Sequence, residues 1–98
     1  MSTFVLMTKL TPEVTKDVKH REQIGKIWMK TVNEKVPGIK WLSHYALLGP
    51  YDFMDIFEAP DEEAAAKVSM ITLASGAIQA ESWVALPYQR FLELADEI

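Results

Sequence analysis

The sequence predicts an α+β protein, with one four-stranded antiparallel sheet and helices packed on one of its faces. Four segments rich in β-branched and aromatic residues alternate with two segments whose apolar residues recur at helical spacing. Two of the strand segments follow each other directly across the short turn Gly49-Pro50-Tyr51-Asp52, which indicates a hairpin. At 98 residues the chain has the length of one domain, so we expect residues 1–98 to form a single domain.

The first strand and helix are expected in the N-terminal third of the chain. Apolar and β-branched residues fill Thr3–Leu10, and the pair Thr11-Pro12 that follows is typical of a helix N-terminus. Within Arg21–Val36 the apolar residues fall mainly on one helical stripe, with lysines and glutamates opposite. Pro37-Gly38 ends this helix, because proline disfavours helical geometry before it and glycine accepts the turn.

The second half repeats strand and helix in the order that completes the sheet. The hairpin strands are expected at Ile39–Leu48 and Phe53–Glu58, and Asp61 can cap a helix that ends at Gly76. A fourth strand, Ala77–Leu86, precedes a short helix, Pro87–Asp96, with Phe91, Leu92 and Ala95 facing inward. The order β-α-β-β-α-β with a short C-terminal helix is that of ferredoxin-like folds.

Bulk composition excludes several classes of function. The formal net charge is -4 and the lysines are scattered, so no basic patch is expected for nucleic acid or an anionic membrane surface. The absence of cysteine excludes disulfides, thiol catalysis and thiolate metal sites, and it is compatible with a reducing cytoplasm. The N-terminal segment lacks the basic start and the long apolar stretch of a signal peptide. We therefore expect a soluble, cytoplasmic protein.

One face of the predicted sheet has no cover within the chain, because right-handed crossovers place both main helices on the other face. We use the mid-strand charge of Asp55 to assign the faces, since a half-exposed sheet alternates to polar residues on its solvent side. The uncovered set is then Leu42, His44, Ala46, Leu48, Phe53, Asp55 and Phe57, with Gln79, Glu81 and Trp83 of the last strand. The helix-covered set is Trp41, Tyr45, Leu47, Met54 and Ile56, with Ile78, Ala80, Val84 and Leu86.

These assignments predict self-association. Covering Leu42, Leu48, Phe53 and Phe57 would contribute roughly 6 to 12 kcal/mol, at about 1.5 to 3 kcal/mol for each side chain. The freedom lost on association costs a similar amount, ~4 to 15 kcal/mol. We therefore expect two copies to stack their uncovered faces into a homodimer, a dimeric α/β barrel, or to build a higher homo-oligomer.

The candidate site lies in the interior of this expected barrel. With Leu48 opposite Phe53, Ala46 lies opposite Asp55 and His44 lies diagonal to it at about 7 Å. A carboxylate taken out of water needs a partner, and an imidazole, an ordered water or a bound ligand would each serve.

The residue types around Asp55 leave three kinds of site open. The first is a structural hydrogen bond between His44 and Asp55, and the second is a ligand pocket that includes Glu81 and Trp83. Tyr51 could cap this pocket with its hydroxyl or hold the hairpin with its ring. The third is a metal site of His44, Asp55 and Glu81, which no ligand-spacing motif supports.

The turn and its flanks resemble the GYD domain family of small bacterial and archaeal proteins. The resemblance runs from FVLMTKLTPE, Phe4–Glu13, through YALLGPYDFMDIFEAPDEEAA, Tyr45–Ala65, to the end of the fourth strand. It implies a dimeric ferredoxin-like fold and no particular activity. The turn is also similar to the Gly-x-Tyr-Asp turn in effector domains of leucine-responsive-type regulators, which implies small-molecule sensing at most. The Asn, Trp and His pattern of related monooxygenases is not matched.

Three functions are compatible with these observations. We favour a homo-oligomeric, sensor-like or carrier-like protein that binds a small organic molecule near His44, Asp55, Tyr51, Glu81 and Trp83. The second function is a small cofactor-independent enzyme of monooxygenase or isomerase type, in which His44 is the catalytic base and Asp55 orients it. The third is a structural interaction protein with a filled barrel. We expect no cofactor, no metal ion, and no nucleic-acid or membrane partner.

Overall fold

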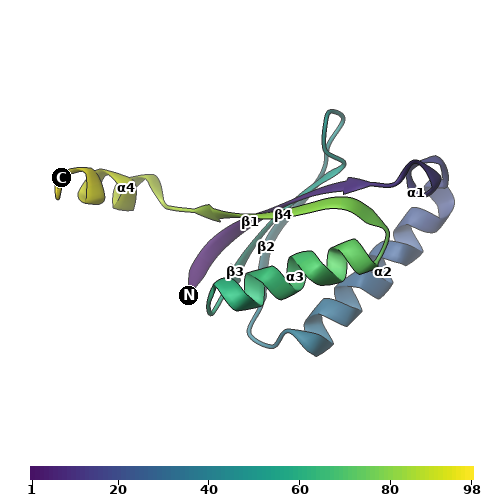
Figure 1. Cartoon of the computed structure of the whole chain (residues 1–98), viewed down its shortest axis with the longest axis horizontal. Helices are drawn as coiled ribbons and strands as arrows, with labels where there is room; N and C mark the ends of the chain where they lie inside the picture. The colour runs from purple at the N-terminus through teal and green to yellow at the C-terminus, as the bar shows by residue number, and fades with distance from the viewer.

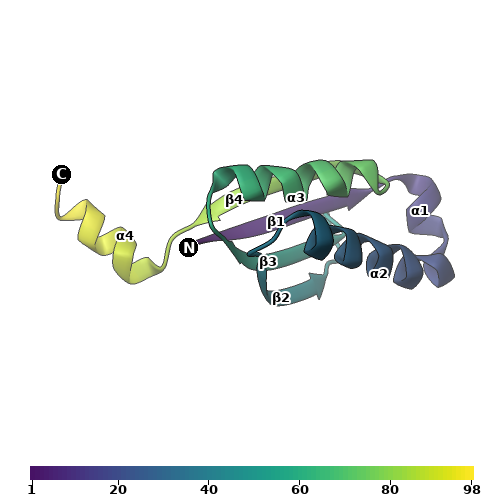
Figure 2. The same cartoon turned by 90° about the horizontal axis from the view of Figure 1, so that it is seen from below.

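A four-stranded antiparallel sheet carries two long helices on one face and leaves its other face without a helix (Figures 1 and 2). The computed structural model describes residues 1–98. Its elements are β1 (Ser2–Leu10), α1 (Pro12–Lys16), α2 (Val18–Lys35), β2 (Lys40–Ala46), β3 (Phe53–Ala59), α3 (Glu62–Ala74), β4 (Ala77–Ala85) and α4 (Tyr88–Ala95). None of the helices combines the length and the apolar character needed to cross a membrane.

The strand order is β2-β3-β1-β4, with every neighbouring pair antiparallel. The two central strands, β1 and β3, are the first and third in the chain. This topology confirms the ferredoxin-like βαββαβ arrangement that the order of elements predicts. The predicted strand and helix positions agree with the observed bounds to within a few residues, except that two helices, α1 and α2, replace the single helix expected between Thr11-Pro12 and Pro37.

Local side-chain chemistry explains where the helices begin. Thr11 caps α1 by accepting a hydrogen bond from the Val14 amide, and Asp61 caps α3 by accepting one from the Ala64 amide at 2.8 Å. Asp17 separates α1 from α2, and its carboxylate caps α2 by accepting a hydrogen bond from the His20 amide.

The core fills the space between the sheet and helices α2 and α3. Its centre is a cluster of aromatic rings, in which Phe57 lies 5.7 Å from Phe4 and 5.4 Å from Trp41, and Trp41 lies 5.3 Å from Trp28, measured between ring centroids. The other buried members of the core are Leu6, Val32, Val36, Ala59, Ala64, Ala65 and Val68.

The assignment of the hairpin strands to the two faces of the sheet was wrong. Phe57 and Asp55 lie on the helix-covered face, at 0% and 2% exposure. Met54 and Ile56, which alternate with them on β3, face away from the helices. The rule that placed the charge outward failed because Asp55 has a polar partner and a cavity beside it, described below.

A β-bulge in β2 explains why Trp41 nevertheless lies on the helix side, as expected. Trp41 pairs with Phe57 and Ser43 pairs with the adjacent Ile56, so Leu42 is an extra residue in β2. Beyond the bulge, His44 pairs with Asp55 and Ala46 with Phe53 on the covered face. The pairing differs by two residues from the predicted one, because the loop between β2 and β3 is longer than the turn that we assumed.

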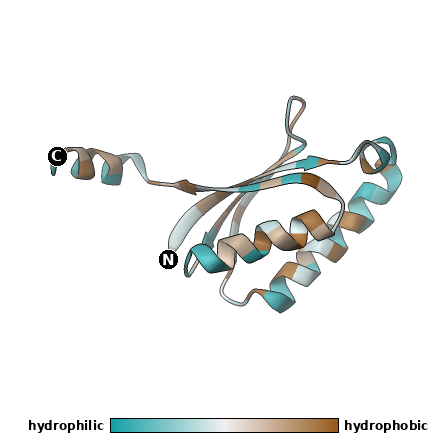
Figure 3. Cartoon of the chain, in the orientation of Figure 1, coloured by the Kyte–Doolittle hydropathy of each residue, from teal (hydrophilic) through white to brown (hydrophobic).

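The C-terminal helix α4 projects beyond the end of the sheet (Figures 1 and 2). The expectation that Phe91, Leu92 and Ala95 face inward was therefore wrong, and Phe91 is 54% exposed. Hydrophobic and hydrophilic residues nevertheless alternate along α4 at helical spacing (Figure 3). The apolar side of α4 thus lacks a packing surface within its own chain.

Candidate functional site

The centre of the covered face carries a hydrogen-bonded pair of titratable side chains, His44 and Asp55. β3 is a central strand and places Asp55 under α2, and the β2–β3 register sets His44 directly opposite. The Nδ1 atom of His44 and Oδ1 of Asp55 form the hydrogen bond. The structural pair expected from the sequence is therefore present, although its partners are directly opposite rather than diagonal.

The two members of this pair differ in their contact with solvent. The Asp55 side chain is 2% exposed, whereas that of His44 is 57% exposed and stacks on Phe53 with 5.5 Å between ring centroids. Burial raises the pKa of the Asp55 carboxyl, and the neighbouring His44 opposes that shift. Because Asp55 binds Nδ1 of the imidazole, Nε2 remains available to accept or donate a proton.

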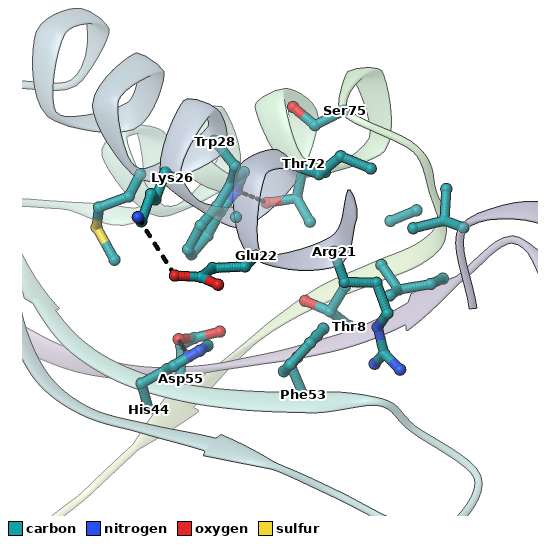
Figure 4. A pocket seen from close by; sticks show the side chains of 16 residues that line it. Thr8, Arg21, Glu22, Lys26, Trp28, His44, Phe53, Asp55, Thr72 and Ser75 are labelled. Atoms are coloured by element: carbon teal, nitrogen blue, oxygen red, sulfur yellow. Dashed lines mark hydrogen bonds and ion pairs between the residues drawn. The ribbon is translucent and has the colours of Figure 1, made fainter. Parts of the chain in front are cut away.

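A pocket of about 510 Å³ lies beside the pair, between α2 and the sheet (Figure 4). This is within the usual size range of sites for small organic molecules, which is about 300 to 1,000 Å³. Its walls are mostly apolar, with Trp28 and Ile24 from α2 facing Leu10 and Phe53 from the sheet. Three buried polar residues also line it: Asp55, Thr8 and Thr72.

Charged residues of the first turns of α2 also line this pocket. The guanidinium carbon of Arg21 lies 5.3 Å from the centroid of the Phe53 ring, a cation–π arrangement. Glu22 and Lys26 form an ion pair with each other at 3.3 Å, so their charges are mutually compensated. Arg21 has no ion-pair partner in the chain.

The other predicted site residues lie on the opposite, uncovered face of the sheet. Met7 pairs with Glu81 and Val5 with Trp83, which places both β4 side chains away from the helices. The carboxylate of Glu81 accepts hydrogen bonds from the Tyr51 hydroxyl at 3.1 Å and from Trp83 Nε1 at 2.9 Å. The hydrogen bond to Glu81 raises the pKa of the Tyr51 phenol.

Side chains of the loop between β2 and β3 attach this loop to strands β4 and β1. It stands on the side of the sheet opposite α2 and α3 (Figure 1), where the Tyr51 ring meets Trp83 edge-on at 6.2 Å. The adjacent Asp52 accepts a hydrogen bond from the Leu10 amide at 2.8 Å, at the point where the β1–β4 register shifts. Tyr51 and Asp52 of the turn motif therefore act as attachment points to β4 and β1.

The predicted site residues thus form two groups separated by the thickness of the sheet. His44 and Asp55 belong to the pocket under α2, whereas Tyr51, Glu81 and Trp83 belong to the uncovered face. The expectation that Glu81 lies near Asp55 was wrong, because it followed from the wrong face assignment. His44, Asp55 and Glu81 consequently cannot share a metal ion, and no other cluster of three potential ligands is present.

Sequence reasoning missed the helical side of the pocket. Arg21, Gly25 and Trp28 recur at spacings of three and four residues and line the pocket together. We placed the apolar residues of this helix on one stripe and assigned none of them to a site. The sequence signal that could have revealed this side of the pocket is the presence of Arg21 and Gly25 on the same helix face as Trp28, where apolar side chains would be expected in a plain core.

Comparison with known proteins confirms the family that the sequence resembles. The family model described as "GYD domain" matches residues 4–95. The chain belongs to the GYD domain family. This GYD protein is 31% identical over 91 residues to the "Glutamine synthetase and cystathionine beta-lyase binding protein" of Thermus thermophilus, with 89% of this chain and 90% of that protein covered. No solved structure matches the chain.

Proposed function

We propose that this GYD protein is a homo-oligomeric binding protein, in which two copies cover each other's uncovered sheet face and the assembly binds other proteins. The observation that carries the proposal is the apolar centre of that face. We define the open-face set as the side chains Val5, Met7, Tyr45, Met54, Ile56 and Trp83, which the strand register places together on the side away from the helices.

The open-face set does not follow the pattern of a sheet face in water. A wet face of an antiparallel sheet alternates to polar residues, yet here Lys9, Glu58 and Gln79 lie toward the ends of the strands. Two further polar residues, Ser43 and Glu81, lie on the edge strands β2 and β4, and the Glu81 carboxylate is hydrogen-bonded to Tyr51 and Trp83. An apolar centre with a polar rim is the usual layout of a protein interface. Tyr45 and Trp83 remain 53% and 46% exposed in the single chain and would gain most from a cover.

The energies support association through this face. Full burial of a large apolar side chain contributes about 1.5 to 3 kcal/mol, and association costs ~4 to 15 kcal/mol. Met7 is already buried in the single chain, and the other five side chains are partly exposed, so covering them gives a gain of the same order as this cost. A two-fold arrangement would bring two copies of the open-face set together, so each favourable contact would occur twice.

The projecting helix α4 supplies further surface for the same association. A helix of eight residues is marginal when isolated in water, because its nucleation is not repaid over so short a length. Tyr88, Phe91, Leu92 and Ala95 recur on one side of α4 and are exposed in the single chain. Packing this side against a second copy would stabilise the helix and enlarge the interface.

Light scattering tests the self-association. We expect a particle mass at least twice the 11.1 kDa of one chain at micromolar concentration. The variant Ile56→Lys places a charge at the centre of the open-face set and should reduce the mass to that of one chain. The matched variant Met70→Lys makes the same change at an exposed position of α3 and should keep the assembly. A single folded chain in the wild type would reject the proposal.

The binding of other proteins rests on the relative rather than on a contact in this chain. The Thermus thermophilus relative is named for its binding of glutamine synthetase and cystathionine β-lyase, and we extend that property to this chain. Biolayer interferometry with the wild type immobilised should show saturable binding of one or both of these enzymes. Absence of binding to both would reject this part of the proposal and leave the light-scattering result as the test of self-association.

A further inference from the structure

We propose that the pocket under α2 binds a small organic acid with an aromatic ring, which donates a hydrogen bond to Asp55 at its inner end and presents its carboxylate to Arg21. The pocket lies within one chain, so this inference does not depend on the assembly proposed above. Three independent features of the pocket support it: two oxygens without partners, a glycine that packing does not require, and an unpaired guanidinium.

The first feature is the state of the buried polar atoms. Asp55 and Thr8 are 2% and 4% exposed, and both line the pocket. Within the chain, Oδ2 of Asp55 and the Thr8 hydroxyl have no hydrogen-bond partner, whereas every side-chain polar atom that is fully sealed from solvent has one. These two oxygens therefore border the open space of the pocket. A ligand hydroxyl there would donate to Asp55 and could also accept from Thr8.

The second feature is Gly25, which lies in the interior of α2 and lines the pocket. Its φ is not positive, and a Cβ built at this position would meet no atom within 4 Å. Glycine in a helix interior costs stability relative to alanine. Neither the backbone conformation nor the packing of this chain requires a glycine at position 25. The missing side chain instead leaves the space between α2 and the sheet open for a ligand.

The third feature fixes the ends of the ligand. Trp28 provides a flat apolar wall that suits a ring. The Arg21 guanidinium lies over Phe53, which also lines the pocket, and has no acidic partner in the chain. An arginine fork of this kind recognises a planar carboxylate through two parallel hydrogen bonds. A ring with a hydroxyl at one end and a carboxylate at the other meets all three requirements.

Three related compounds test the ligand class by calorimetric titration of the wild type. The probe is 4-hydroxyphenylacetate; phenylacetate lacks the donor for Asp55, and 4-methylphenol lacks the carboxylate for Arg21. A hydrogen bond to a charged group is worth about tenfold to a hundredfold in affinity, so each control compound should bind at least about tenfold more weakly than the probe. Equal affinity of the three compounds, or no measurable binding of the probe, would overturn the inference.

Variants of Gly25 and Asp55 test the location. Gly25→Leu fills the pocket and should abolish binding of the probe, whereas Gly25→Ala adds a single carbon and should retain it with a higher melting temperature. Asp55→Asn should lower the affinity for the probe by about tenfold or more and leave the affinity for phenylacetate nearly unchanged. Light scattering on the same samples should give the wild-type mass for all three variants. Wild-type affinity of Gly25→Leu for the probe would show that the ligand binds elsewhere and would sink the assignment.

Discussion

Along β3, the two faces of the sheet differ in the opposite sense from the usual rule. The covered face contains a carboxylate, Asp55, at its centre and a pocket beside it. The uncovered face has an apolar centre and no mid-strand charge in β3. Polarity along β3 therefore does not identify the side that faces solvent, although in β4 the polar residues Gln79 and Glu81 do lie on the uncovered face.

The difference teaches that a charged side chain in a strand can lie on the buried face when it has polar partners there, so its position does not mark the side exposed to water. Asp55 is tolerated under α2 because the His44 imidazole binds one of its oxygens and the pocket receives the other. The apolar side chains on the uncovered face are typical of a surface that another molecule buries. The following predictions test whether the two faces behave as differently in solution as they do in the structure.

The largest effect is expected on the covered face, from Phe57→Ala. Phe57 is fully buried and contacts Phe4 and Trp41, so its truncation should lower the free energy of unfolding by about 3 to 5 kcal/mol. Urea denaturation measures this loss, which should not depend on protein concentration. The control Tyr45→Ala removes a ring from the open-face set, and its effect should vary with concentration. A loss below about 1 kcal/mol for Phe57→Ala would contradict the assigned core.

A smaller effect is expected where the two helices over the covered face meet. Trp28 Nε1 donates a buried hydrogen bond to Thr72 Oγ1 at 2.8 Å. Thr72→Val keeps the shape of the side chain but leaves that N–H without a partner, at a cost of about 1 to 3 kcal/mol. In the double variant with Trp28→Phe the donor is also absent, so the effect of Thr72→Val should be smaller there than in the wild type. Equal effects in both backgrounds would show that the hydrogen bond does not stabilise the fold.

Titration of Asp55 should distinguish the covered face by its pH dependence. Because burial raises the pKa of Asp55, the unfolded chain releases this proton first, near pH 3.8, while the folded chain retains it. Asp55 should therefore lower stability as the pH rises from that value through the folded pKa. Denaturation curves at several pH values should show Asp55→Asn gaining stability relative to the wild type over this window.

An opposite control is available at Asp17. A hydrogen bond from His20 lowers the pKa of the Asp17 carboxyl, so its stabilising contribution is present above the ordinary value and is lost as the pH falls. Asp17→Asn should therefore change the pH profile in the direction opposite to Asp55→Asn. Profiles of the two variants that shift in the same direction would contradict the assigned environments.

The smallest effect is expected at the loop above the uncovered face. The hydrogen bond between Tyr51 and Glu81 raises the pKa of the phenol. Glu81→Gln should lower that pKa toward its ordinary value, which an absorbance titration of the tyrosines at alkaline pH can follow. Tyr51→Phe identifies the contribution of this residue among the three tyrosines. An unchanged titration in Glu81→Gln would mean that the loop does not rest on β4 in solution.

Most of the fold could be predicted from the sequence because its signals are local. Thr11-Pro12 and Asp61 begin helices through their own side chains, and Gly38 and Gly76 follow helix ends with φ of 92° and 112°, which glycine tolerates best. The order of elements then determines the ferredoxin-like topology. The helical side of α4 was also identified correctly, but its packing depends on a surface that its own chain does not supply.

The site was predicted only in part because it depends on long-range geometry. The hydrogen-bonded pair of His44 and Asp55 followed from their neighbouring strands, whereas the face on which they lie did not. Within a regular strand, alternation fixes which residues share a face, but it does not say which face the helices cover and it fails across the bulge in β2. Glu81 was placed on the uncovered face correctly and Asp55 was not, so the two were brought together wrongly.

The extra residue Leu42 divides β2 into two parts: before it an odd-numbered residue faces the helices, and after it the even-numbered residues do. Trp41 is an odd-numbered position and His44 an even-numbered one, and side chains in a regular strand alternate between faces. Without the bulge, a strand that buried Trp41 among Phe57 and Trp28 would turn the imidazole away from Asp55. A regular strand of the same sequence could therefore keep either Trp41 in the aromatic cluster or His44 beside Asp55, but not both. Only the irregular strand places both side chains on the same face.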